Sequence, residues 1–308
     1  MRDLLRVSDG MMAKVNRASG PIPVDPRSTP GLPGDVPGGA PAKAWSKDEV
    51  ARLGVLLAAH QERLFATAAA GAGNQRVLLV LQALDCGGKD GTVRSIGGVM
   101  DPLGLHIRAF GAPSAVERSH HFLWRISRAM PPAGYVGVFN RSHYEDVLVA
   151  RVRSLVPRKV WQRRYDEINC FEEAEAANGT MLIKVLLHIS YEEQRDRLLS
   201  RLDDPTKRWK FDPGDLDDRA RWHDYQVAYA DVLKRCSKSH APWYVVPADR
   251  KWYRNWAVAN LLVAHFHEMG LTYPEVDLDV DSLKARLADG SAVAHPDNGG
   301  GRAKKNAK

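Results

Sequence analysis

A glycine-rich segment at residues 83–92 carries the residue types that bind phosphate in nucleotide-handling proteins. In such a loop, glycines let backbone N–H groups turn toward phosphate oxygens, and a lysine reaches the phosphate that is transferred. The segment follows the apolar run Val77–Leu81 and precedes a predicted helix, whose positive N-terminus favours an anion. The order of strand, loop and helix therefore predicts a Walker A loop. The residues that we assign to phosphate binding in it are Gly87, Gly88, Lys89, Asp90, Gly91 and Thr92.

The loop departs from the pattern G-x-x-x-x-G-K-[ST] at two positions. Ala83 replaces the first glycine, and Asp90 stands where a hydroxyl usually binds Mg²⁺. Asp85 lies inside the loop, where its carboxylate would repel phosphate unless a divalent cation lay between them. We therefore regard Asp85 as a candidate Mg²⁺ ligand. The alternative that the local sequence leaves open is a glycine-rich turn that binds no ligand.

A second polar cluster, residues 139–146, follows another apolar run. Open α/β sheets bind ligands at the carboxyl ends of their strands, so we expect this cluster to lie near the phosphate loop. Asn140 occupies the place where a Walker B strand delivers its acid, and Arg141 would clamp a phosphate through two hydrogen bonds. Glu145 and Asp146 would complete a magnesium shell. The alternative for these two acids is a charged first helical turn, which the helix dipole favours.

Five short apolar runs predict the strands that position these residues, and the segments between them are long enough for helices. This alternation favours a layered α/β fold with a mostly parallel sheet. A closing helix is predicted over residues 251–269, with Gly270 as its stop. The predicted strands lie at residues 77–81, 107–110, 136–139, 181–189 and 243–246.

Composition divides the chain into three parts. Residues 1–45 are expected to form an extended arm, because the prolines and glycines between Pro21 and Pro41 resist a packed core. The folded domain is predicted over residues 46–275, where Ser46 and Glu49 form a capping-box pattern for a helix that runs to about residue 70. Residues 276–308 are expected to be a flexible basic tail.

Residues 201–233 interrupt the alternation of strands and helices, because they are dense in charged and aromatic side chains. We interpret them as a mobile lid, since lids in phosphoryl-transfer enzymes supply cations and exclude water. A solvated helical hairpin without a role is the alternative. The lid residues that we assign to phosphate binding are Lys207, Arg208 and Lys210.

The whole chain favours a polyanionic partner and a reducing compartment. A net charge of +7 gathers phosphate-bearing molecules, although charge alone does not separate nucleic acid, anionic lipid and polyphosphate. Three widely spaced cysteines suggest neither a disulfide framework nor a metal site. No export signal or membrane-length apolar run is apparent, so we expect a soluble cytoplasmic protein.

With these motifs in order along the chain, the sequence resembles the polyphosphate kinase 2 family over most of its length. The resemblance implies a P-loop kinase-like three-layer sandwich with a mostly parallel central sheet and a helical lid. It also implies catalysis with Mg²⁺ or Mn²⁺ as cofactor. The stretches that carry it are the phosphate loop, residues 139–149, the lid at 203–211, and the segments 25–31, 122–126 and 241–254.

Within that family, the stretch Asn140–Asp146 is similar to the branch that phosphorylates nucleoside monophosphates as well as diphosphates. The more restricted branches usually carry aspartate at the position of Asn140. The resemblance implies inorganic polyphosphate as donor and AMP and ADP as acceptors, with adenine or guanine bases. It also implies a homodimer or homotetramer, without a nucleic-acid or membrane partner. The family more often has glycine at the positions of Ala83 and Asp90, and an acid at Asp90 would weaken polyphosphate binding or alter the metal demand.

The resemblance assigns roles to named residues, which we write as expectations. Basic residues that include Arg94 and Arg141 would line the polyphosphate channel with the lid cations. The expected catalytic residues are Asp85, Lys89, Arg141 and Glu145. The expected nucleotide-binding residues are Asn140, Arg141, His143 and Tyr144. The expected metal ligands are Asp85, Glu145 and Asp146.

Three other functions compete with direct in-line transfer from polyphosphate. His120, His121 and His143 raise the alternative of a phosphohistidine intermediate, which P-loop chemistry does not need. An ATP-dependent nucleotide kinase is a second alternative, since a Walker-type loop does not specify its donor. A non-catalytic polyphosphate or nucleotide sensor is the third, although the acids of the site would add little to a pure anion binder.

Overall fold

The computed structural model describes residues 1–12, 21–34, 36 and 40–289. Residues 1–273 and 274–308 form two separate units. The first unit holds a five-stranded sheet in the order β2-β3-β1-β4-β5, and all four strand pairings are parallel. The predicted sheet is confirmed, and the observed bounds lie close to the predicted ones. The strands are β1 (Arg76–Gln82), β2 (Leu105–Ala109), β3 (Val136–Asn140), β4 (Thr180–His188) and β5 (Trp243–Pro247).

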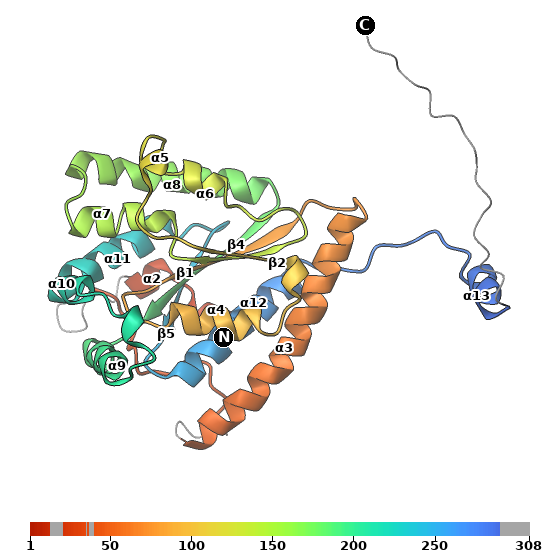
Figure 1. The fold of residues 1–308 in the computed structure, drawn as a ribbon, viewed down its shortest axis with the longest axis horizontal. Coiled ribbons are helices and arrows are strands. Elements are labelled where there is room, and N and C mark those ends of the chain that lie inside the picture. The colour runs from red at the N-terminus through yellow and green to blue at the C-terminus, as the bar shows by residue number, and fades with distance from the viewer. Residues whose placement is uncertain (13–20, 35, 37–39, 290–308) are drawn as a thin grey trace, which may run out of the picture. The chain divides into compact units, whose positions relative to one another are not determined.

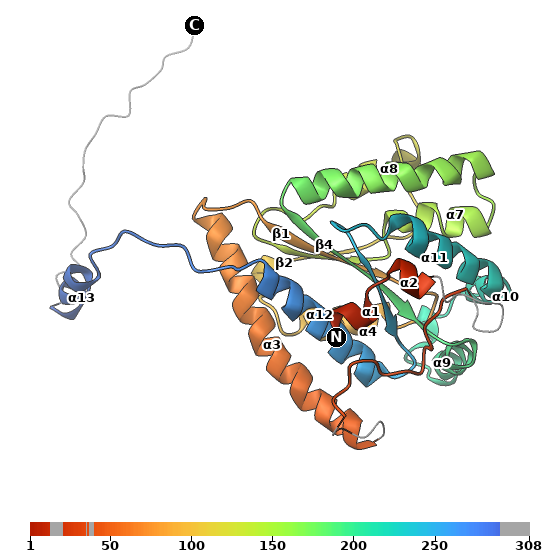
Figure 2. The ribbon, with the colours of Figure 1, turned by 180° about the vertical axis from the view of Figure 1, so that it is seen from behind.

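Helices cover both faces of this sheet, as Figures 1 and 2 show from opposite sides. Alternate strand residues face opposite layers: Leu79 and Val138 pack with the first group of helices, whereas Val80 and Phe139 pack with the second. The chain therefore forms the expected three layers. The first layer contains α3 (Ala40–Ala69), α4 (Lys89–Gly97) and α12 (Lys251–Glu268). The second contains α7 (Val149–Val152), α8 (Arg158–Ala177) and α11 (Trp222–Cys236).

Helix α3 begins at Ala40, so the predicted start at a capping box on Ser46 is wrong. The Ser46 hydroxyl donates to the backbone carbonyl of Lys43 inside the helix, 2.9 Å away, and caps nothing. The preceding turn is held by packing, because Ala42 is fully buried and the Trp45 ring lies edge-on to Trp256 of α12 at 5.4 Å. Tertiary contacts therefore extend this helix beyond its local signal.

The N-terminal residues pack on the edge of the sheet at β5. Helices α1 (Arg2–Leu5) and α2 (Asp9–Met12) were not predicted from the sequence. Arg6 forms an antiparallel bridge with Tyr244, and the Val7 backbone N–H donates to the Trp243 carbonyl at 2.8 Å. Residues 21–34 then run through turns and bends, with the Pro30 carbonyl accepting a bond from the Tyr253 hydroxyl.

The predicted lid is helical, but its last part belongs to the core. It comprises the end of α9 (Tyr191–Asp203), the turn η3 (Arg208–Lys210), α10 (Gly214–Ala220) and most of α11. Val232 and Cys236 of α11 are fully buried in the second layer. The regular apolar face of α11 explains this difference, since such a face packs on a sheet rather than covering a site.

The second unit contains the helix α13 (Val280–Ala288), which the sequence analysis placed in a flexible tail. Asp279 caps this helix by accepting from the Ser282 backbone N–H at 3.1 Å. The rest of the predicted tail, residues 290–308, lies outside the described residues. In the described ranges, no helix combines the length and hydrophobicity that crossing a membrane would need.

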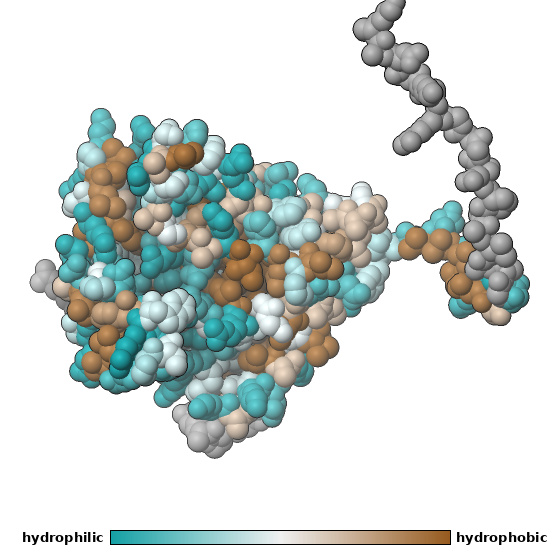
Figure 3. All heavy atoms as spheres, viewed as in Figure 1, coloured by the Kyte–Doolittle hydropathy of each residue, from teal (hydrophilic) through white to brown (hydrophobic). Residues whose placement is uncertain are grey.

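Short elements complete the first unit and connect the sheet to its helices. They are η1 (Pro102–Gly104), α5 (Ala115–Arg118), α6 (Trp124–Ser127) and η2 (His143–Asp146). Of these, η2 follows β3 directly and carries the second polar cluster predicted from the sequence. Hydrophilic side chains cover much of the face drawn in Figure 3, with groups of hydrophobic residues between them.

Candidate active site

The predicted phosphate loop connects β1 to α4 at the carboxyl edge of the sheet. Cys86 and Gly88 both have left-handed backbone conformations, with φ of 62° and 104°, which turn the chain tightly before α4 begins. The Lys89 side chain folds back over the loop, and its ammonium donates to the carbonyls of Ala83 at 2.7 Å and Leu84 at 3.4 Å. Burial lowers the pKa of Lys89. The loop thus has the strand, turn and helix arrangement expected of a phosphate cradle.

A cavity of about 910 Å³ opens above this loop. Its wall is formed by the loop, the ends of β2 and β3, the helices α9 and α12, and the lid. Arg94, Lys207 and Lys210 all line it, as the sequence analysis expected of the basic residues. Cations from α4, α9, the lid and α12, together with Arg141 after β3, face one space, which is the arrangement that a polyphosphate chain or a nucleotide requires.

Arg141 connects the two predicted motifs. Its guanidinium lies 2.9 Å from the Asp85 carboxylate and 3.8 Å from the Glu145 carboxylate, and its backbone is left-handed with φ of 63°. The charge of Glu145 raises the pKa of Arg141. Burial raises the pKa of Glu145, against the opposing effect of Arg141. The structure therefore brings together the four residues predicted to be catalytic, since Arg141 bridges the two acids beside Lys89.

Asp90, the loop's unusual acid, pairs with a residue on each side of the cavity. Its carboxylate accepts from the Asn140 amide at 2.9 Å and from the Lys210 ammonium of the lid at 3.4 Å. Partial burial would raise the pKa of Asp90, but the bond from Asn140 and the charge of Lys210 outweigh it, so the pKa is lowered. Asp90 thus ties the loop to β3 and to the lid.

His143 and Tyr144 do not face the cavity, so their predicted contact with a nucleotide is wrong. Both are fully buried in a network around the carboxylate of Glu172. His143 Nε2 lies 3.1 Å from that carboxylate, and the Tyr144 hydroxyl donates to it at 2.8 Å. Lys184 of β4 forms an ion pair with Glu172 and donates to the Tyr144 hydroxyl at 2.9 Å. A buried ion pair needs such partners, and these two side chains supply them.

Asp146 is also directed elsewhere, so the structure does not bring it to Asp85 as a third metal ligand. Its carboxylate pairs with Arg164 at 3.1 Å and with Arg125 at 3.7 Å, and neither arginine lines the cavity above the phosphate loop. Within the part of the chain that the structure describes, no three His, Cys, Asp or Glu side chains gather into a metal-binding group. Asp85 and Glu145 remain as the acids beside the phosphate loop.

Two residues assigned to phosphate binding point away from the cavity. The Thr92 hydroxyl is fully buried and donates to the Gly88 carbonyl at 3.2 Å. Arg208 donates through Nε to the Leu202 carbonyl at 2.6 Å, while its lid neighbours Lys207 and Lys210 line the cavity. Both side chains therefore bind backbone carbonyls of nearby residues instead of facing the cavity.

Several side chains that line the cavity were not predicted as site residues from the sequence. Arg197 and Arg201 come from α9, Asp215 comes from α10, and Lys251 and Arg254 come from α12. The available signal was their position, because α9 and α12 follow β4 and β5 and so begin at the same carboxyl edge of the sheet as the phosphate loop.

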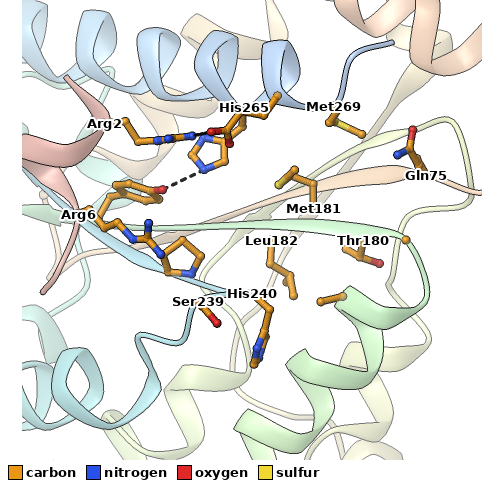
Figure 4. Close-up of a pocket in the computed structure, with 15 residues that line it drawn as sticks. Arg2, Arg6, Gln75, Thr180, Met181, Leu182, Ser239, His240, His265 and Met269 are labelled. Carbon is orange, nitrogen blue, oxygen red and sulfur yellow. Dashed lines mark hydrogen bonds and ion pairs between the residues drawn. The ribbon is translucent and has the colours of Figure 1, made fainter.

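A second cavity of about 500 Å³ lies at the opposite edge of the sheet, where β4 begins at Thr180 (Figure 4). Two pairs of its polar side chains bind each other. Arg2 is paired with Glu268, and the Tyr244 hydroxyl is bonded to His265 Nε2 at 3.0 Å. The phosphate loop is far from this cavity along β1, so we assign the chemistry to the first one.

Comparison with known proteins agrees with this assignment. Residues 43–272 match the family model described as polyphosphate kinase 2. An AMP/ADP-polyphosphate phosphotransferase from Meiothermus ruber is 48% identical over 70% of this chain and 79% of its own. An ADP-polyphosphate phosphotransferase from Rhodopseudomonas palustris is 41% identical over 65% of this chain and 73% of its own. The crystal structure of polyphosphate kinase 2 from Arthrobacter aurescens TC1 superposes with a TM-score of 0.85 at 44% identity, covering 93% of this chain and 96% of that one.

Proposed function

The chain belongs to the polyphosphate kinase 2 family, and we propose on that basis that it transfers a phosphoryl group from inorganic polyphosphate to AMP and ADP. The observation that carries this proposal is the bridge that Arg141 makes between Asp85 and Glu145 beside the buried ammonium of Lys89. Lys89, Asp85 and Arg141 thus line one cavity, with Glu145 behind Arg141, and they supply the cations that a phosphoryl transfer between two anions requires.

Each residue has a physical task in the proposed transfer. Lys89 and the backbone N–H groups of the loop bind the phosphoryl group that moves, and they spread the charge that develops on its oxygens. Arg141 binds the acceptor phosphate, and Asp85 and Glu145 hold the Arg141 guanidinium in place. The acceptor oxygen then attacks the terminal phosphorus in line, and the bond to the shortened polyphosphate breaks. The step needs no covalent intermediate with the protein.

We further propose Mg²⁺ or Mn²⁺ as cofactor. Mg²⁺ is usually held by one or two protein carboxylates while substrate phosphates and water complete its shell, so Asp85 and Glu145 fit such an ion without a third acid. When bound, the ion would neutralise negative charge on the phosphates. The support for this cofactor is that Asp85 lines the cavity proposed to hold the substrate phosphates.

We also propose guanine nucleotides as acceptors besides adenine nucleotides. A homodimer or homotetramer is supported by exposed apolar side chains near the β2 edge, with Val55 at 70%, Leu103 at 75% and Ile107 at 49% exposure. A cytoplasmic location is supported by three unpaired cysteines.

The experiment that tests the donor compares polyphosphate with ATP at one acceptor. Purified protein with Mg²⁺ and AMP is expected to form ADP from polyphosphate, and to do so much faster than from ATP at equal phosphate concentration. Faster transfer from ATP would instead support an ATP-dependent kinase. Binding of polyphosphate without any product would support a sensor.

A further inference from the structure

Arg254 of α12 lies directly on the phosphate loop. Its guanidinium occupies the space that a side chain at Gly88 would fill, and its Nη2 would lie 2.8 Å from a Cβ added at Gly91. Both glycines are thus needed for this close approach as well as for the backbone turn. The residue is 4% exposed and lines the same cavity as Lys89. A cation is therefore held against the loop that binds the transferring phosphate.

Among the described residues, the Arg254 guanidinium has no acidic partner. Its hydrogen bonds there go to the neutral side chain of Asn255, at 3.1 Å from Nε and 2.9 Å from Nη2. Burial and the charge of Arg197 lower the pKa of Arg254 to about 10. A buried cation without a counter-charge is costly, and a bound anion would remove that cost.

The neighbouring Arg197 has a different task. Its guanidinium donates four hydrogen bonds, to the Glu193 carboxylate and to the carbonyls of Cys86, Ala248 and Asp249, at 2.7–2.9 Å. It therefore fixes the loop to the end of β5. Arg254, by contrast, has no bond from Nη1 to any acceptor in the described part of the chain.

A second cation stands beside Arg254 on the same helix. Lys251 is exposed at the start of α12 and lines the cavity. Its pKa is lowered by the partial burial of its ammonium and by the charges of Arg197, Arg254 and Lys207, so these four cations share one region. The sheet order places that region on the β5 side of the loop, whereas Asn140 and Arg141 follow β3 on the other side.

We propose that Arg254 and Lys251 form a donor subsite, which binds the phosphates of the polyphosphate chain on the β5 side of the phosphate loop. The acceptor nucleotide then binds on the β3 side. A linear polyanion suits this subsite because its successive phosphates carry charge along its whole length, whereas a nucleotide carries a base at one end. The inference rests on the proposed function and adds the direction from which the donor enters.

Kinetics with each substrate varied in turn tests the subsite. Initial rates are measured for the wild type, Arg254→Gln, Arg254→Lys and Lys251→Gln, and folding is checked by circular dichroism. In Arg254→Gln we expect the KM for polyphosphate to rise about tenfold while the KM for ADP changes little, because a charge-assisted bond is lost. Lys251→Gln should raise the KM for polyphosphate about threefold. Arg254→Lys should lie between, since it keeps the charge but not the planar fork.

The control removes the same charge far from the site. Arg163→Gln on α8, where the exposed Arg163 pairs with Glu167, should leave both KM values unchanged. Direct titration with polyphosphate in the absence of nucleotide should show the same order of affinities. An unchanged KM for polyphosphate in both variants, or a rise in the KM for ADP alone, would overturn the subsite. If Arg254→Gln does not fold, Lys251→Gln decides. A wild type that binds polyphosphate without turnover would instead overturn the proposed function.

Discussion

Asp90 of the phosphate loop and Lys210 of the lid lie 3.4 Å apart across the mouth of the cavity. In this pair, the charge of a lid cation is neutralised by Asp90, at a position where glycine is expected to be more common in the family. A donor chain that approaches Lys210 has to compete with the Asp90 carboxylate and is repelled by it. We therefore expect Asp90 to weaken the binding of polyphosphate, which can be measured.

Replacing Asp90 with asparagine should strengthen donor binding. We expect Asp90→Asn to lower the KM for polyphosphate by about three- to tenfold at low salt, because Lys210 is freed and a repulsion is removed. The gain should shrink as ionic strength rises. Asp48→Asn, which removes an exposed acid on α3, is the matched control. An equal change in the control would show that net charge alone is responsible.

Replacing Lys89 should stop the chemistry and leave the fold. In Lys89→Met, turnover is expected to fall by at least about 10²- to 10³-fold, since a preorganised cation facing the transferring phosphate is lost. The measurement is the turnover number at saturating polyphosphate and ADP, with thermal unfolding as the check on folding. A variant that keeps near-normal turnover would remove Lys89 from the mechanism.

The buried pair of Glu172 and Lys184 should dominate local stability. Lys184→Met leaves the Glu172 carboxylate buried without its cation and should lower the free energy of unfolding by about 3–5 kcal/mol. The double variant Glu172→Gln with Lys184→Met should lose less than the sum of the two single variants, as urea unfolding would show. Simple additivity of the two losses would mean that the network around His143 and Tyr144 is not coupled.

Asp215 predicts a pH dependence of stability. Burial and the nearby charge of Asp85 raise the pKa of Asp215 to about 6 from an ordinary value near 4. The folded state therefore binds the proton more tightly than the unfolded chain does. Stability that this group contributes is complete below pH 4 and is lost as the pH rises to about 6.

The comparison of the wild type with Asp215→Asn isolates that effect, because asparagine does not titrate. Between about pH 4.5 and 7, the wild type should lose about 1–3 kcal/mol of unfolding free energy relative to the variant. Chemical denaturation at several pH values measures the difference. A difference that is constant with pH would show that Asp215 does not titrate in this range.

The strands and the phosphate loop could be predicted because their signals are local. The run Val77–Leu81 is continuous and apolar, as a strand buried on both faces requires, and the glycines and Lys89 follow it directly. The start of α3 could not be predicted, since the contact of Trp45 with Trp256 joins distant parts of the chain.

The predicted nucleotide contacts of His143 and Tyr144 were wrong for a similar reason. Their position after a predicted strand favoured a ligand contact, but the sequence does not show that Glu172 and Lys184 come from α8 and β4 to meet them. The place of Arg254 on the loop likewise depends on how α12 packs beside α4. Spacing along the chain identifies which residues follow a strand, and only the packed structure shows which way each side chain points.

Polyphosphate-dependent transfer is tested by nucleotide formation from polyphosphate when AMP and ADP are offered separately, with Mg²⁺ and without added ATP. We expect ADP from AMP and ATP from ADP in the wild type, with both products almost absent in Lys89→Met. No product from either acceptor, in a folded protein that binds polyphosphate, would contradict it.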